Sequence, residues 1–167
     1  MNDIQDALES IRRYQPVSWE SIPDFGLYMD QVITFVARAY QPLYGDDTPS
    51  YLSAPMINNY VKGKLIPRPS GKKYSREQIA LLIMIVALKQ ISSMEDIRRM
   101  LTLKEGETVE SLYDGFCKRF SYVIQTMHNT ESSILSPLTS ALDFAIHASV
   151  YRAGCAAILK FEMEKGK

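Results

Sequence analysis

The feature that most constrains the fold is an uninterrupted apolar run, Ile79–Leu88. Ser75 is a suitable N-cap, and the helical pattern continues to about Gln90. A helix that is apolar on nearly every side has to be surrounded by other elements. The run is well short of the roughly 18–20 residues that a membrane span needs, and a later apolar stretch, 138–161, is interrupted by charged residues. We therefore expect a central buried helix and no membrane contact.

The rest of the chain is predicted to be mostly helical. Asp24, Ser53, Ser93 and Thr108 precede helical patterns as N-caps, and Pro42 is expected to end the second helix. Residues 65–74 hold too much Pro and Gly for a helix, so their outer residues are expected to pair as a small hairpin around 69–71. The fold class is therefore all-α, mainly helical, with a small β-hairpin wing. Beside the central helix, the predicted helices cover 3–14, 25–40, 54–62, 94–103, 108–127 and 137–163.

Length and composition indicate one globular domain that works in the cytoplasm. The 167 residues are 46% hydrophobic and 23% charged, which is enough to build a core. The first residues, 1–13, have no hydrophobic run of the kind found in a signal peptide. Cys117 and Cys155 are too few for a disulfide framework, so a reducing compartment is expected.

Positive charge is concentrated in the middle of the chain. Residues 48–76 have a net charge of +6 and no acidic residue, between a segment 1–47 of net −5 and a segment 77–167 of net −1. Ordinary protein surfaces mix the two signs. A basic helix followed by a basic hairpin is suited to the phosphate backbone of double-stranded DNA.

The predicted helix 54–62 has two distinct faces. Met56, Ile57 and Val61 lie on one side, and Asn58 and Asn59 lie on the other. Asparagine can read adenine in the major groove, whereas lysine and arginine contact phosphates and set the register. Two neighbouring asparagines can also be ordinary solvated or capping residues, and a run of charge can be a solvated face.

The DNA-binding reading assigns helix 54–62 to the major groove as a recognition helix and residues 66–74 to the phosphate backbone as a wing. Tyr74 would pack its ring on the recognition helix and direct its hydroxyl toward a phosphate, or it would be a core residue at the junction of hairpin and helix. The candidate DNA-binding residues are Ser53, Asn58, Asn59, Tyr60, Lys62, Lys64, Arg68, Lys72, Lys73, Tyr74 and Arg76.

One resemblance supports this reading, and a second one, which covers more of the chain, identifies a family without supplying a function. The chain resembles the winged helix-turn-helix of MerR-type regulators over about 51–103. The resemblance lies in residues 57–67, in the Lys-Lys-Tyr-Ser of 72–75 and in the helix pair around 79–97. Asn58, Asn59 and Lys64 stand where that pattern has Arg, Tyr and Gly. Trp19, residues 22–24, 27–32, 56–62 and 73–76 resemble the bacterial domain-of-unknown-function 1836 family, over nearly the whole chain.

The DNA-binding reading divides the chain into three parts of one compact unit. Residues 1–47 would pack on the core, and 48–104 would form a winged helix-turn-helix embedded in a helical bundle. Residues 105–167 would form a C-terminal helical region for dimerisation or sensing. The last helix is rich in small and apolar side chains, which favours a homodimer, with an intramolecular cover or a pocket for a small-molecule effector as alternatives.

No arrangement of residues indicates an enzyme or a cofactor. Asp143 and His147 are four residues apart on one helix face with Cys155 nearby, but a metal site or catalytic triad needs more groups. His128 is expected at a helix end, and Glu105, Glu107 and Glu110 are best explained as favourable charge at a helix N-terminus. A winged-helix module that binds a protein partner instead of DNA is the alternative function.

Overall fold

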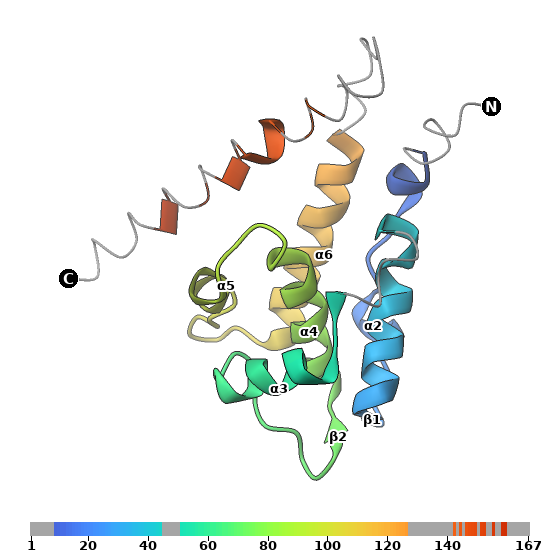
Figure 1. The fold of residues 1–167 in the computed structure, drawn as a ribbon, viewed down its shortest axis with the longest axis vertical. Helices are drawn as coiled ribbons and strands as arrows, with labels where there is room; N and C mark the ends of the chain where they lie inside the picture. Colours follow the sequence, from blue (N-terminus) through green and yellow to red (C-terminus); the bar gives the residue numbers. More distant parts are fainter. Residues whose placement is uncertain are drawn as a thin grey trace.

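The computed structural model describes residues 9–44 and 51–126. Nearer the C-terminus it also describes residues 142, 144, 146–149, 151–152, 155 and 158–159. In these residues most of the chain is helical, and two short strands pair as an antiparallel sheet. This confirms the predicted fold class, mainly helical with a small β element (Figure 1). None of the helices in the described residues is long and apolar enough to cross a membrane.

Helix α4 (Arg76–Leu88) is the centre of the fold, as its apolar run predicts. Ser75 and Gln78 form a capping box, in which the Gln78 N–H donates to Ser75 Oγ (3.4 Å) and the Ser75 N–H donates to Gln78 Oε1 (2.7 Å). Every residue from Gln78 to Val86 is buried. Removing one large apolar side chain here from water contributes about 1.5–3 kcal/mol, so α4 is the main source of core stability.

Helix α2 (Met29–Tyr44) packs on one side of α4, and its bounds differ from the predicted 25–40. It begins later because the preceding residues form a strand and the Tyr28 N–H donates to Gln31 Oε1 (2.9 Å) at its first turn. It continues through Pro42, so the prediction that this proline ends the helix is wrong. Only one hydrogen bond is lost there, and the Tyr44 ring packs on Tyr40 with centroids 5.5 Å apart.

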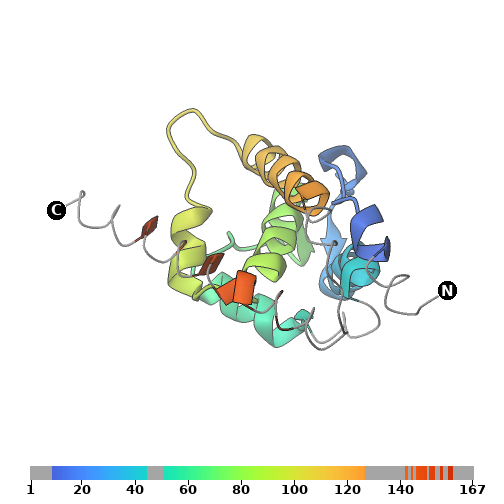
Figure 2. The same cartoon turned by 90° about the horizontal axis from the view of Figure 1, so that it is seen from above.

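Helix α6 (Val109–Thr126) packs against α4 over much of its length (Figure 2). Thr108 caps it as predicted, with the Ser111 N–H donating to Thr108 Oγ1 (3.1 Å). Tyr113 is fully buried and donates from its hydroxyl to the carbonyl of Val17 (2.7 Å), which ties the N-terminal segment to this helix. Val123, near the C-terminal end of α6, is 58% exposed.

Two short helices complete the body. Helix α3 (Ala54–Lys62) has the predicted bounds. Helix α5 (Met94–Met100) has the predicted Ser93 cap, but it ends before the predicted residue 103, and Leu103 is 41% exposed with little to pack against. A single 3-10 turn, η1 (Trp19–Ser21), places the Trp19 ring 6.2 Å from the ring of Tyr113.

The sheet has two very short strands, β1 (Leu27–Tyr28) and β2 (Lys73–Tyr74). They are antiparallel, with Leu27 opposite Tyr74 and Tyr28 opposite Lys73. The predicted hairpin within 65–74 is therefore only partly right: Ser70 and Lys73 form a bridge across the turn, but the strand partner of β2 comes from a segment far earlier in the chain. Leu65 and Ile66 do not pair with β2, because the N–H groups of both donate to the carbonyl of Tyr60 (2.9 and 3.4 Å).

Several predicted features lie outside the described residues. They are the beginning of the first helix, the start of the last helix at Ser136 and Pro137, His128 and Asp143. The described residues between 142 and 159 are helical, and Cys155 Sγ lies 4.0 Å from Met100 Sδ. In the parts of the chain that are described, no group of three or more His, Cys, Asp or Glu residues could hold a metal ion.

Candidate nucleic-acid interface

Helix α3, the loop that follows it and β2 lie together at one end of the molecule (Figure 1). Five basic side chains of this segment are exposed, and within the described ranges none of them forms an ion pair with a carboxylate. Their charge is therefore available to an anionic partner. The five residues are Lys62, Lys64, Arg68, Lys72 and Lys73.

Helix α3 has the two faces that its sequence predicts. Ile57 and Tyr60 are buried, whereas Asn58 and Asn59 are exposed. Pro55 lies in the first turn, where its missing N–H costs nothing. Ser53 is the N-cap residue by its backbone geometry, but its hydroxyl makes no capping hydrogen bond, and the residue is half-buried.

The turn after α3 is held firmly against the core. Lys64 has φ +56°, a left-handed conformation that is unusual for a residue other than glycine. The Leu65 N–H donates to the carbonyl of Tyr60 (2.9 Å), and Leu65 and Ile66 are buried. Gly63 is the C-cap residue of α3, but its φ is −75°, so the left-handed residue of the turn is Lys64.

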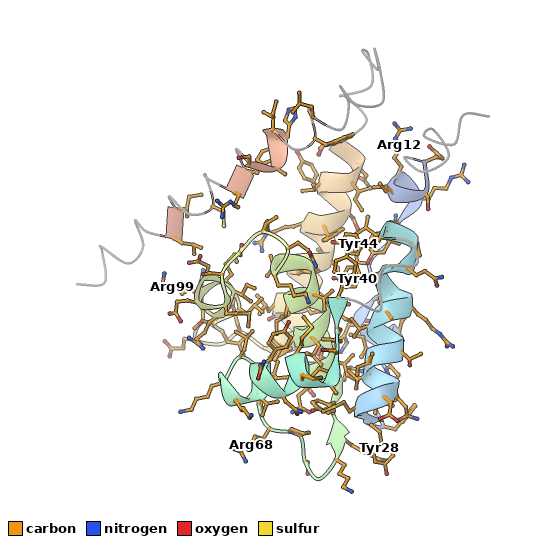
Figure 3. All side chains as sticks on the ribbon, in the orientation of Figure 1. Arg12, Tyr28, Tyr40, Tyr44, Arg68 and Arg99 are labelled. Carbon is orange, nitrogen blue, oxygen red and sulfur yellow. The ribbon has the colours of Figure 1, made fainter. Side chains whose placement is uncertain are left out.

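The loop between the turn and β2 is fixed at both ends. Gln78 Nε2 donates to the carbonyl of Pro67 (2.9 Å), which attaches the loop to the first turn of α4. Arg68 comes directly after this attachment and projects from the loop into solvent (Figure 3). Gly71 takes φ +62° in the turn before Lys73. The basic side chains of the loop therefore stand on a supported backbone.

Strand β2 directs its two side chains in opposite directions. Lys73 is exposed, and its Nζ lies 5.3 Å from the centroid of the Tyr28 ring, a cation–π contact across the sheet. Tyr74 is 3% exposed, and burial raises the pKa of its hydroxyl. Tyr60 is 5% exposed, and burial likewise raises the pKa of its hydroxyl. These two tyrosines of the candidate set belong to the core beneath the surface.

Arg76 differs from the other basic residues because its guanidinium group is engaged within the chain. Its Nε donates to the carbonyl of Ile22 (2.8 Å), and its Nη2 lies 3.8 Å from Asp24 Oδ2. The guanidinium carbon also lies 5.6 Å from the ring centroid of Trp19. Arg76 therefore attaches the N-terminal segment to the start of α4.

Sequence reasoning missed one basic residue at the edge of this surface. Arg98 of α5 donates from Nη2 to the carbonyl of Gly63 (2.6 Å) and from Nη1 to Glu95. Glu95 also pairs with Arg99, which in turn pairs with Asp96, so the two arginines and the two carboxylates of α5 balance each other. Only the fold brings α5 to the end of α3, and the sequence pattern gives no sign of it.

Two exposed aromatic residues were also missed. Phe25 is 72% exposed and Tyr28 is 48% exposed, and both precede α2 in the segment that pairs with β2. Figure 3 shows Tyr28 at the same end of the molecule as Arg68. The sequence assigned residues 25–28 to a helix, which concealed their position beside the basic loop.

A hollow lies outside the basic surface, between α4, α5 and α6. It has a volume of about 440 Å³ and a mainly apolar lining with one arginine. Its lining residues are Met84, Leu88, Met100, Leu101, Leu112, Phe116, Arg119, Phe120 and Val123.

Comparison with known protein families matches residues 17–116 to the model of a domain of unknown function, DUF1836. The chain belongs to the DUF1836 family. The matched range begins before η1 and ends within α6, so the DUF1836 domain holds the whole basic surface, the Arg76 attachment and α5. No curated protein and no solved structure matches the chain. The DUF1836 match confirms the family resemblance, whereas the resemblance to MerR-type regulators stays a prediction.

Proposed function

We propose that this DUF1836 protein binds double-stranded DNA and acts as a transcriptional regulator in the cytoplasm. The observation that carries the proposal is the set of five exposed cations on α3, its following turn and the loop to β2, none of which is paired with a carboxylate in the described residues. A duplex carries one negative charge per roughly 1.7 Å of its axis, which complements such a surface. The proposal assigns no catalytic step to the protein.

The shape of the segment supports the same role. Helix α3 exposes Asn58 and Asn59, and an α-helix with its side chains, about 10–12 Å across, fits a major groove of roughly 12 Å width. Arg68, Lys72 and Lys73 follow on the supported loop, where they would contact the backbone beside that groove. The asparagines would read bases and the cations would supply affinity.

Salt dependence is the direct test. A labelled duplex pool is titrated with the protein at several salt concentrations, and fluorescence anisotropy gives the affinity. Neutralising five phosphates predicts a slope of log K against log [salt] of about −4.5. Lys72→Glu with Lys73→Glu should weaken binding to every sequence, while Asn58→Ala should mainly reduce discrimination between sequences.

The matched control is Lys104→Glu with Lys118→Glu. Both lysines are exposed, and the double variant changes the net charge of the protein by the same amount. If this control weakens binding as much as the Lys72 and Lys73 variant, the basic surface is not the binding site. Absence of any duplex binding by the wild-type protein at low salt would remove the proposal.

A protein-binding role is the second candidate, and exposed apolar side chains outside the basic surface favour it. Tyr122, Tyr151 and Ile158 are each about two-thirds exposed or more. Recovery of one protein partner in stoichiometric amount, without DNA, in a pull-down tests this candidate.

Under the first proposal, the same residues of the C-terminal helices serve a homodimer, whose two basic surfaces would address half-sites about 34 Å apart. The hollow of about 440 Å³ is large enough for a small-molecule effector. Light scattering of the purified protein tests the dimer.

A further inference from the structure

The apolar ring of Phe25 is exposed to solvent at the edge of the basic surface. It is 72% exposed, and it lies directly before Gly26 and the strand that pairs with β2. An isolated exposed apolar side chain is common, but it is usually on a surface without other signs of binding. Here the neighbouring strand carries Lys73, and the loop before that strand carries Lys72.

The backbone on both sides of Phe25 is anchored. On one side, the Arg76 side chain holds residues 22–24 in place. Its Nε donates to the carbonyl of Ile22 (2.8 Å), and its Nη2 lies 3.8 Å from Asp24 Oδ2. On the other side, Gly26 takes φ +73° and comes so close to β2 that an added Cβ would lie 3.3 Å from Lys73 Cβ. The ring of Phe25 is therefore presented from a fixed turn and not from a loose loop.

The charges around the ring favour a nucleic acid as its partner. The carboxylate next to it in the chain, Asp24, already faces Arg76. The exposed cations Lys72 and Lys73 form no ion pair in the described part of the chain. A flat apolar ring beside free cations complements a partner that has flat apolar faces next to anionic groups. Nucleic-acid bases beside phosphates have this combination.

We propose that Phe25 is an apolar wedge that stacks on a base at a step which opens when a duplex binds the basic surface. The inference rests on the proposed DNA-binding function and adds a second contact, from the segment before α2. Wedges of this kind unstack one base step and bend the duplex by roughly 20–90°. The segment before β1 would therefore deform DNA, while the wing contacts the DNA backbone.

The test measures binding and bending in the same sample. A duplex of about 30 base pairs, selected by the wild-type protein from a random-sequence pool, carries a donor dye at one end and an acceptor dye at the other. Binding of the wild-type protein should increase energy transfer. Phe25→Ala should abolish the increase and weaken binding about 5- to 100-fold, and Phe25→Leu should retain part of the bend.

Leu103→Ala is the matched control, because it removes another large apolar side chain, 41% exposed, from the segment between α5 and α6, outside both the basic surface and the proposed dimer contacts. It should change neither bending nor affinity. A wild-type complex without a bend, or a Phe25→Ala complex that bends like the wild type, overturns the wedge while leaving DNA binding intact. Absence of any duplex binding by the wild type overturns the proposed function and the wedge with it.

Discussion

Arg76 Nε donates a hydrogen bond to the carbonyl of Ile22 (2.8 Å), so the first residue of α4 holds the segment that supplies β1. The same guanidinium lies over the Trp19 ring and faces Asp24. Among the six basic residues of 48–76, Arg76 therefore stabilises the fold, while the other five are exposed to solvent. Stability and DNA binding should consequently separate between individual basic residues.

Arg76→Ala should lower the free energy of unfolding by about 2 kcal/mol, because it removes a charge-assisted hydrogen bond and a cation–π contact from a side chain that is only 24% exposed. Urea unfolding measures the change. The control is Arg68→Ala, at an exposed site that forms no ion pair among the described residues, which should stay within about 0.5 kcal/mol of the wild type. Equal losses in the two variants would contradict the assigned role of Arg76.

Lys64→Gly should raise the free energy of unfolding by about 1 kcal/mol. Lys64 has φ +56°, where an L side chain costs roughly 1–2 kcal/mol and glycine has no such cost. Lys62→Gly removes the same charge from the last residue of α3 and should instead lower stability by about 0.5–1 kcal/mol. Thermal unfolding of the two variants compares them directly, and a loss of stability in Lys64→Gly would refute the strain.

Gly26→Ala should destabilise the protein more than Gly71→Ala. Both glycines have positive φ, at +73° and +62°, so both substitutions have the backbone cost of about 1–2 kcal/mol. Only at Gly26 would the new Cβ meet a neighbour, Lys73 Cβ at 3.3 Å, whereas Gly71 has nothing within 4 Å. The difference between the two unfolding free energies isolates the close approach of the segment to β2, and equal values would argue against it.

Alkaline conditions should destabilise the fold through its buried tyrosines. Burial raises the pKa of the hydroxyls of Tyr14, Tyr40 and Tyr113 above the ordinary value of 10.0. Above that pH the unfolded chain releases these protons while the folded chain keeps them. The free energy of unfolding should therefore be level below about pH 10 and fall above it, by about 1.4 kcal/mol per pH unit for each tyrosine.

Tyr40→Phe separates two effects in this experiment. It removes the hydrogen bond from the Tyr40 hydroxyl to the carbonyl of Ile83 (2.8 Å), which should lower stability at neutral pH by about 1 kcal/mol. It also removes one titrating group, so the decline above pH 10 should become less steep. Denaturant unfolding at a series of pH values measures both, and an unchanged slope would show that Tyr40 does not contribute to the pH dependence.

The sequence predicted the parts of the fold that depend on local signals. The apolar run 79–88 with its Ser75 cap identified α4, and Thr108 and Ser53 identified the starts of α6 and α3. Residues 25–28 were predicted as helix because their apolar spacing matches one, but pairing with β2 decides their structure. A contact between distant segments leaves no periodic pattern, so it could not be read from the chain.

The candidate site was also predicted only in part from the sequence. Exposure of the two asparagines on α3 and of five basic residues agrees with the charge pattern. The pattern could not reveal that Arg76 is engaged within the chain, since its partners come from residues 19–24. Nor could it reveal Arg98 or Phe25, because only tertiary packing places these two residues beside the basic surface.

Strand β2 is completed by residues that lie far earlier in the chain, and this gives the wing a different folding behaviour from α4. Its pairing depends on closing a long loop and gains only a two-residue ladder in return. The amide protons of the two-residue ladder should therefore exchange before those of α4. A partner that contacts residues 24–28 would thus also slow the exchange of the amides in β2.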